Sequence, residues 1–184
     1  MLQLEIKDSE FFDEENQTFV TIKGQTLQLE HSLVSVSKWE AKWKKPFLSN
    51  EAKSPEETID YIRFMTITQN VNPLIYSVIA SDSSIIERVN KYIDDPMTAT
   101  TFTKVEGKGR GNSGKATTSE ELYYMIAANQ IPFEVQRWHL NRLMVLLRVF
   151  DEKNKPKKKM RKGETAKRYR SINAARKARL GTHG

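Results

Sequence analysis

The beginning of the chain alternates apolar and polar side chains with the two-residue period of a half-buried strand. Residues 2–6 show this pattern first, and two further runs follow at 19–22 and 26–29. These two runs flank Gly24, which can adopt a positive φ angle in a tight turn. We therefore predict a hairpin of 19–22 with 26–29 that turns at Gly24.

From about Ser32 onward, apolar residues recur at helical spacing. Ser54, Pro55 and Glu57 form a helix start, in which the serine caps the backbone and the glutamate completes a capping box. The stretch 132–150 is apolar around most of its girth, which predicts a helix at the centre of the core. The predicted helices span 32–45, 54–67, 83–93, 118–129 and 132–150, with a short apolar segment at 73–79. The fold class is therefore α+β, mostly helical, with an N-terminal β-hairpin or small antiparallel sheet.

A glycine-rich segment at 104–118 interrupts the helical pattern, and we interpret it as a flexible exposed loop. Residues 109–114 fit the dinucleotide pattern G-x-G-x-x-G, and 109–116 nearly fit the phosphate loop G-x-x-x-x-G-K-[ST]. Ala116 stands where the phosphate loop needs a hydroxyl for magnesium, and no βαβ unit surrounds the segment. A nucleotide-using enzyme is therefore a remote hypothesis. Contact of this basic loop with phosphates or an acidic partner stays open.

Positive charge is concentrated toward the C-terminal end of the chain. Residues 153–184 hold 13 Lys and Arg against the single acid Glu164, whereas residues 1–152 hold 17 basic and 22 acidic residues. We therefore expect a compact acidic domain over 1–152 and a basic tail, helical or disordered, over 153–184. The helix-forming part of this tail has no clean apolar stripe. We expect it to gain little by docking on its own domain and to become ordered on an acidic partner.

A basic tail of this kind binds a polyanion with strong salt dependence and little sequence preference. An acidic protein surface attracts it by the same Coulombic force, and a tail that only improves solubility is the simplest alternative. Tyr169 is its one aromatic residue, so stacking on bases is not strongly indicated. The candidates for binding a polyanion or an acidic partner are Lys157, Lys158, Lys159, Arg161, Lys162, Lys167, Arg168, Arg170, Arg176, Lys177 and Arg179.

The sequence offers little for catalysis or metal binding. It has no cysteine and three histidines, none in a metal-binding spacing, so we expect no metal, no cofactor and no enzymatic activity. We interpret His139 as a structural histidine. The sequence lacks a run of about 18 apolar residues and a basic segment followed by an apolar one at its start, so we expect neither a membrane span nor a secretory signal.

Trp39 and Trp43 lie four residues apart among several lysines, on one side of a predicted helix. One interpretation is an aromatic and basic binding surface. The interpretation we favour is a ridge that faces the core, with the lysines toward solvent. Both hold if one of the two tryptophans faces a partner.

Four segments resemble a family of small proteins from tailed bacteriophages. They cover 26–40, 65–73, 131–143 and 173–181, and the sequence Trp-His-Leu-Asn-Arg at 138–142 is the most particular part. The resemblance extends over most of the chain and implies a role in virion assembly without catalysis, closest to that of a tail assembly chaperone. Such chaperones coat the helical tape-measure protein and recruit tail-tube subunits.

On this resemblance we expect the protein to act in the host cytoplasm during phage assembly, with tape-measure and tail-tube proteins as partners. The helix at 132–150 and the tryptophan ridge would frame an apolar groove for the tape measure, and the tail would reach acidic partner segments. A structural virion protein at the head–tail junction or in the head, whose tail contacts nucleic acid, is the alternative, and homo-oligomerisation stays open. The residues expected to bind partners are Trp39, Trp43, Arg137, Trp138 and Arg142.

Overall fold

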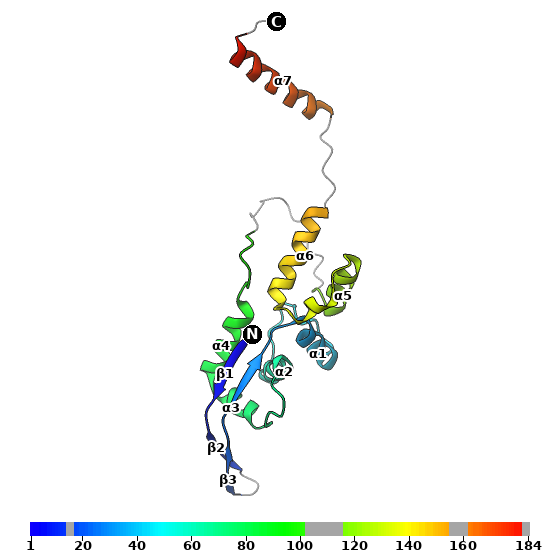
Figure 1. The fold of residues 1–184 in the computed structure, drawn as a ribbon. Helices are drawn as coiled ribbons and strands as arrows, with labels where there is room; N and C mark the ends of the chain where they lie inside the picture. Colours follow the sequence, from blue (N-terminus) through cyan, green and yellow to red (C-terminus); the bar gives the residue numbers. More distant parts are fainter. Residues whose placement is uncertain (14–16, 102–115, 155–161, 182–184) are drawn as a thin grey trace. The chain divides into compact units, whose positions relative to one another are not determined.

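Strands come first and helices follow along the chain (Figure 1). The computed structural model describes residues 1–13, 17–101, 116–154 and 162–181. The predicted α+β class, mostly helical with a small antiparallel sheet near the N-terminus, is confirmed. The strands are β1 (Leu2–Ile6), β2 (Ser9–Asp13), β3 (Thr18–Ile22) and β4 (Gln25–Leu29). The helices are α1 (Leu33–Trp43), α2 (Pro55–Met65), α3 (Ile75–Ser81), α4 (Ser83–Asp94), α5 (Ser119–Ala128), the 3-10 helix η1 (Phe133–Arg137), α6 (Leu140–Asn154) and α7 (Lys162–Leu180).

Contacts divide the chain into two units, Met1–Phe150 and Asp151–Gly184, two residues before the boundary expected from charge. The glycine-rich segment predicted as a loop at 104–118 lies outside the described residues except for 116–118. In the described part of the chain, no helix is long and apolar enough to cross a membrane. Also outside the described residues are the tail residues Lys157, Lys158, Lys159 and Arg161.

The four strands pair as two antiparallel two-stranded sheets, β1 with β4 and β2 with β3. The predicted hairpin of β3 with β4 is therefore wrong. Ile6 pairs with Gln25, and Ser9 pairs with Ile22 in the same register, so β1 continues into β2 where β4 continues back into β3. Gly24 lies at this junction, between β3 and β4. A Cβ on Gly24 would come within 2.3 Å of the Ile6 carbonyl oxygen. Gly24 thus permits a close approach of two backbones, not a turn.

β4 also pairs with the residues that follow α2. The Ile67 N–H donates to the Gln28 carbonyl at 2.8 Å, and the Glu30 N–H donates to the Met65 carbonyl at 2.9 Å. Ile67 therefore lies beyond the helix and is 51% exposed, so the predicted helix over 54–67 extends two residues too far. This pairing fixes the end of α2 beside the sheet.

Two serines begin the helices that form the centre of the first unit. Ser54 accepts a hydrogen bond from the Glu57 N–H at 3.2 Å, and the Glu57 carboxylate accepts one from the Ser54 N–H at 2.8 Å. The predicted capping box is confirmed. Ser32 and Ser35 make the same reciprocal pair at the start of α1. Each such cap stabilises a helix by about 1 kcal/mol.

The core lies where β1 and β4 meet the helices α1 to α6. Trp39 of α1 is its largest fully buried side chain, 1% exposed. Burying one large apolar side chain contributes about 1.5–3 kcal/mol, so the fully buried apolar side chains dominate the stability of the unit. The other large side chains that are fully buried are Leu4, Ile22, Leu27, Leu29, Leu33, Ile62, Met65, Ile75, Ile79, Leu122 and Ile126.

The single helix predicted over 132–150 is wrong. The 3-10 helix η1 ends at Arg137, Trp138 is extended (φ −72°, ψ 161°), and α6 begins only at Leu140. At this break the backbone bonds to the segment before α1: His139 forms a β-bridge with Ser32, and the Leu140 N–H donates to the His31 carbonyl at 2.7 Å. A tertiary backbone contact therefore interrupts a stretch whose side-chain pattern is helical throughout.

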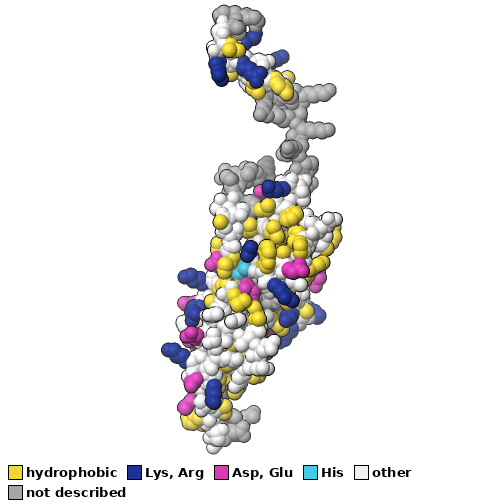
Figure 2. Space-filling model, viewed as in Figure 1, with side chains coloured by type: hydrophobic (Ala, Val, Ile, Leu, Met, Phe, Trp, Pro, Cys, Tyr) yellow, Lys and Arg dark blue, Asp and Glu magenta, His cyan; other side chains and the backbone are white. Residues whose placement is uncertain are grey.

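α6 is also less central than its composition predicts. It buries Leu140, Leu143 and Leu147, which fall on one side of the helix, while Met144 is 37% exposed. The apolar girth that suggested a core helix is thus only partly covered within the described residues. Figure 2 shows hydrophobic side chains gathered at the surface over α5 and α6.

The second unit contains α7. Its described side chains, at 166, 167 and 169–180, are all exposed. Tyr169 is 63% exposed and Leu180 is 71% exposed. That this helix gains little by docking on the first unit stays a prediction. Lys162 and Arg168 lie within the bounds of this helix.

Candidate partner-binding groove

The two tryptophans of α1 have different environments. Trp39 is enclosed in the core, where its indole N–H donates to the Glu57 carbonyl at 2.9 Å and its ring meets Phe47 edge to face. This burial removes Trp39 from the residues expected to contact a partner. Trp43, one turn later, is half-buried and lines a groove. Trp39 therefore faces the core, as in the interpretation favoured from the sequence, and Trp43 stays a candidate for contact with a partner.

The groove lies between the end of α1, the outer side of α2, and α3. Its volume is about 680 Å³. Trp43, Ile59, Tyr76 and Ala80 supply its apolar surface. The polar residues around them are Lys42, Glu56, Asp60, Arg63 and Ser77, with Pro55 at the start of α2.

Two smaller hollows extend this groove along α2. One, of about 380 Å³, shares Arg63 and Tyr76 with it and continues past Val71. The other, of about 260 Å³, shares Ile59 and Ala80 and continues to Ile86 on α4. The combined furrow follows α2, whose 11 residues span about 16 Å at 1.5 Å per residue.

The charges on the groove rim neutralise one another. Asp60 forms ion pairs with Lys42 and, at 3.6 Å, with Arg63. The Arg63 guanidinium lies 4.9 Å from the centre of the Tyr76 ring, and the Lys42 ammonium lies 5.3 Å from that of Trp43. These cation–π contacts hold the two long side chains over the aromatic surface. The rim is therefore polar but close to neutral, and the floor is apolar.

Apart from Trp43, the residues that line the groove were not predicted from the sequence to bind a partner. Glu56, Asp60 and Arg63 recur at helical spacing, which marks an outer side of α2. Nothing in the local sequence indicates that Tyr76 and Ala80 of α3 lie beside that side. The groove also does not involve the stretch 132–150 that was expected to frame it.

The remaining candidates from the sequence form a separate aromatic and basic pair. The Arg142 guanidinium lies 4.3 Å from the centre of the half-buried Trp138 ring. Arg142 and Arg137 are exposed. None of the three lines the groove between α1, α2 and α3. They lie where η1 meets α6. Other exposed apolar side chains of α5, η1 and α6 are Tyr124, Met125, Phe133 and Met144.

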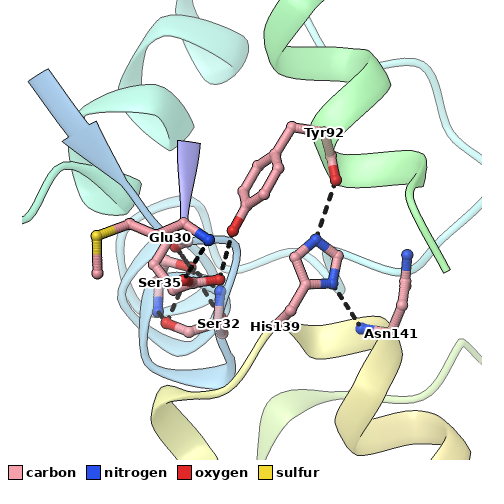
Figure 3. A network of polar contacts seen from close by, with 7 residues as sticks. Glu30, Ser32, Ser35, Tyr92, His139 and Asn141 are labelled. Carbon is pink, nitrogen blue, oxygen red and sulfur yellow. Dashed lines mark hydrogen bonds and ion pairs between the residues drawn. The ribbon is translucent and has the colours of Figure 1, made fainter. Parts of the chain in front are cut away.

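A buried polar cluster joins the N-terminus, α1, α4 and α6 (Figure 3). Tyr92 donates its hydroxyl proton to Glu30 at 2.7 Å, and Glu30 also pairs with the amino group of Met1 at 3.2 Å. His139 bonds through Nε2 to the Tyr92 carbonyl at 3.0 Å, while its Nδ1 accepts the Asn141 N–H at 3.3 Å. In this arrangement Nε2 donates to the Tyr92 carbonyl and Nδ1 is the acceptor. Both ring nitrogens of His139 thus have hydrogen-bond partners, one in α4 and one at the start of α6.

His31 lies against this cluster and has no counterpart in the sequence analysis. Its Nδ1 contacts the Tyr61 hydroxyl, and its ring centre lies 5.0 Å from that of His139. Burial, and secondarily His139, lowers the pKa of His31 to about 3. Burial also raises the pKa of Tyr61. Both groups are therefore neutral near pH 7, and their contact joins the segment that leads into α1 to α2.

The described residues contain no group of three or more His, Asp or Glu side chains able to hold a metal ion. Comparison with protein-family models, with curated proteins and with solved structures found no match for this chain. The geometry available for function is therefore a charge-neutral aromatic groove on one unit and an exposed basic helix on the other. The first suits a partner helix, and the second suits an anion.

Proposed function

We propose that this chain is a non-enzymatic assembly protein of a tailed bacteriophage, a tail assembly chaperone that binds helical segments of the tape-measure protein. The sequence resemblance supports the class of protein. The observation that carries the binding mode is the furrow along α2, with an apolar floor at Trp43, Ile59 and Tyr76. An amphipathic helix binds such a furrow through apolar anchors at successive turns.

The dimensions of the furrow fit this binding mode. Its length of about 16 Å corresponds to about three turns of a partner helix at 5.4 Å per turn. Trp43 and Ile59, which are half-buried, provide apolar surface for anchors on the partner helix, while Tyr76 is 6% exposed and lies at the base of the furrow. Lys42 and Arg63 are held in place by Asp60 and by the rings beneath them, so little side-chain entropy is lost when a partner arrives.

The electrostatics of the groove predict how binding responds to salt. Its two cations share Asp60, and Glu56 lies on the same rim. A neutral rim gives a partner helix little long-range attraction, so affinity comes mainly from buried apolar surface. We therefore expect an affinity that changes little between low and physiological salt.

A substitution that fills the groove tests this function. Ala80 is exposed and lines the groove, so Ala80→Arg places a long side chain over the floor without opening the core. The matched control is Ala41→Arg, because Ala41 is exposed on α1 and does not line the groove. The full chain would be titrated by calorimetry with overlapping peptides from the tape-measure protein encoded in the same phage genome.

We expect at least one peptide to bind, with an affinity at least tenfold weaker for Ala80→Arg and unchanged for Ala41→Arg. Equal affinity of both variants, or no binding by any peptide, would remove the tape-measure role from the groove. Circular dichroism and the thermal midpoint of each variant show whether the fold is intact. Both should match the unsubstituted chain, because both positions are exposed.

The second candidate function is a structural virion protein whose basic helix contacts nucleic acid. The observation that favours it is the exposure of every described side chain of α7. Mass spectrometry of purified virions separates the two functions. A chaperone leaves before the virion is complete and should be absent, whereas a structural protein should be present in defined copy number.

A further inference from the structure

α7 presents positive charge on all its sides. Lys167, Arg170, Arg176 and Arg179 are exposed, and at about 100° per residue they point in four different directions. Glu164 is the one acid in the sequence of this helix. Figure 2 shows dark blue Lys and Arg side chains along α7.

The apolar residues of α7 do not form a binding stripe for a protein groove. Tyr169, Ile172 and Leu180 fall on one side of the helix, but Arg176 lies between Ile172 and Leu180 on that same side. A protein groove that accepted this side would have to bury an arginine, which is unfavourable without a paired acid. A ligand that offers negative charge on more than one side avoids this difficulty.

We propose that α7 binds double-stranded DNA through the phosphates that line its major groove, without reading the base sequence. The helix has 19 residues and is therefore about 28 Å long and, with side chains, about 10–12 Å across. The major groove of DNA is about 12 Å wide and admits one helix. Phosphates then lie on both walls, so cations on opposite sides of α7 all find partners.

Other nucleic acids fit the helix less well. Double-stranded RNA has a deep, narrow major groove that excludes a helix of this width. Single strands are usually held by stacking on aromatic side chains, and Tyr169 is the one aromatic residue of α7. A side chain that recognises a particular base usually makes two hydrogen bonds to the edge of that base. Positive charges distributed around a helix are better placed to contact phosphates. The inference does not depend on the groove along α2 or on the function proposed for it.

The test compares two full-length variants that lose equal charge. The first carries Lys167→Gln, Arg170→Gln, Arg176→Gln and Arg179→Gln in α7. The control carries Lys7→Gln, Lys23→Gln, Lys38→Gln and Lys91→Gln, four exposed lysines of the first unit. Fluorescence anisotropy measures binding to a 24-base-pair DNA duplex of arbitrary sequence at 50–200 mM salt. A second duplex of unrelated sequence, one of its single strands, an RNA duplex and polyglutamate are the comparison ligands.

We expect both DNA duplexes to bind the unsubstituted chain equally, with a plot of log affinity against log salt that falls steeply. The α7 variant should lose about 3–4 units of that slope, since each phosphate contact contributes about 0.9, while the control keeps it. Circular dichroism should show the same helix content for all three proteins. Equal slopes for the two variants would overturn the proposal, as would single-stranded DNA, an RNA duplex or polyglutamate binding as tightly as duplex DNA.

Discussion

The groove along α2 and the helix α7 use charge in opposite ways. In the groove, Lys42 and Arg63 form ion pairs with Asp60 and lie over aromatic rings, so their positive charge is largely balanced by groups of the protein itself. In α7, every described side chain is exposed, and the sequence of the helix has seven basic residues and one acid, Glu164. The same residue types therefore stabilise a shape in one unit and remain available for an outside anion in the other.

This difference also separates what the two units contribute to folding. The first unit buries an apolar core and a polar cluster, and its stability should respond to changes in either. α7 buries none of its described side chains, so its substitution should leave the unfolding of the first unit unchanged.

The largest effect is expected at Trp39. Trp39→Ala removes a fully buried indole and the hydrogen bond to the Glu57 carbonyl, and truncations of this kind cost about 3–5 kcal/mol. Tyr169→Ala on α7, where the ring is 63% exposed, should change stability by less than about 0.5 kcal/mol. Urea unfolding followed by circular dichroism measures both. A loss below about 1 kcal/mol at Trp39 would contradict its place in the core.

The next effect is a loss of stability in mild acid that depends on His31. Its pKa is about 3 in the folded protein and about 6.5 in the unfolded chain. The unfolded chain therefore binds the extra proton between these values, and stability falls as the pH drops below about 6.5. The slope is about 1.4 kcal/mol per pH unit, or about 2 kcal/mol between pH 6.5 and pH 5.

His31→Gln should flatten this dependence between pH 7 and pH 5, because glutamine has no proton to gain. Tyr61→Phe is the matched control, since it removes the hydroxyl that contacts His31 but leaves the imidazole buried. Urea unfolding at pH 7, 6 and 5 provides the three slopes. An unchanged slope in His31→Gln would assign the acid sensitivity to other groups.

A smaller effect is expected at Gly24. Gly24→Ala places a methyl group against the Ile6 carbonyl and the backbone of Lys7 and Asp8, and the strands must separate to accept it. Overpacking of this kind costs about 1–3 kcal/mol. The neighbouring Lys23→Ala, at an exposed position, should cost less than about 0.5 kcal/mol. If Gly24→Ala unfolds at the same urea concentration as the unsubstituted chain, the close approach of the two backbones is wrong.

The sequence was sufficient wherever a local signal decided the structure. Ser54 and Glu57 predicted the start of α2, and the helical repeat predicted both ends of α4 and α5 to within one residue. It failed where a distant segment decided. β4 pairs with the distant β1 and not with the adjacent β3. The helix expected over 132–150 is interrupted by the bridge between His139 and Ser32.

The candidate site divides in the same way. Spacing placed Trp39 and Trp43 on one side of a helix, but only the packing of Phe47 and α2 decides that the first is enclosed and the second lines a groove. Tyr76 and Ala80 join that groove because α3 packs beside α2, which no local pattern encodes. The basic tail needed no tertiary information, since its charge is visible in the composition alone.

The smallest effect is expected for the charges of α7. Replacing Lys167, Arg170, Arg176 and Arg179 by glutamine should shift the thermal midpoint of the first unit by less than about 2 °C, which corresponds to about 0.5 kcal/mol or less for a chain of this size. Glutamine keeps the helix propensity of α7 close to that of lysine and arginine, so the comparison isolates charge. Scanning calorimetry at 20 mM and 200 mM salt measures the midpoint.

The salt arm of that experiment can break the contrast between the two units. Residues 1–152 carry five more acidic than basic residues, so a basic helix that neutralised them would stabilise the first unit by Coulombic attraction. The substituted chain would then melt several degrees lower at 20 mM salt, and the difference would shrink at 200 mM salt because exposed charges are screened. Equal midpoints at both salt concentrations are expected if the cations of α7 serve an outside ligand.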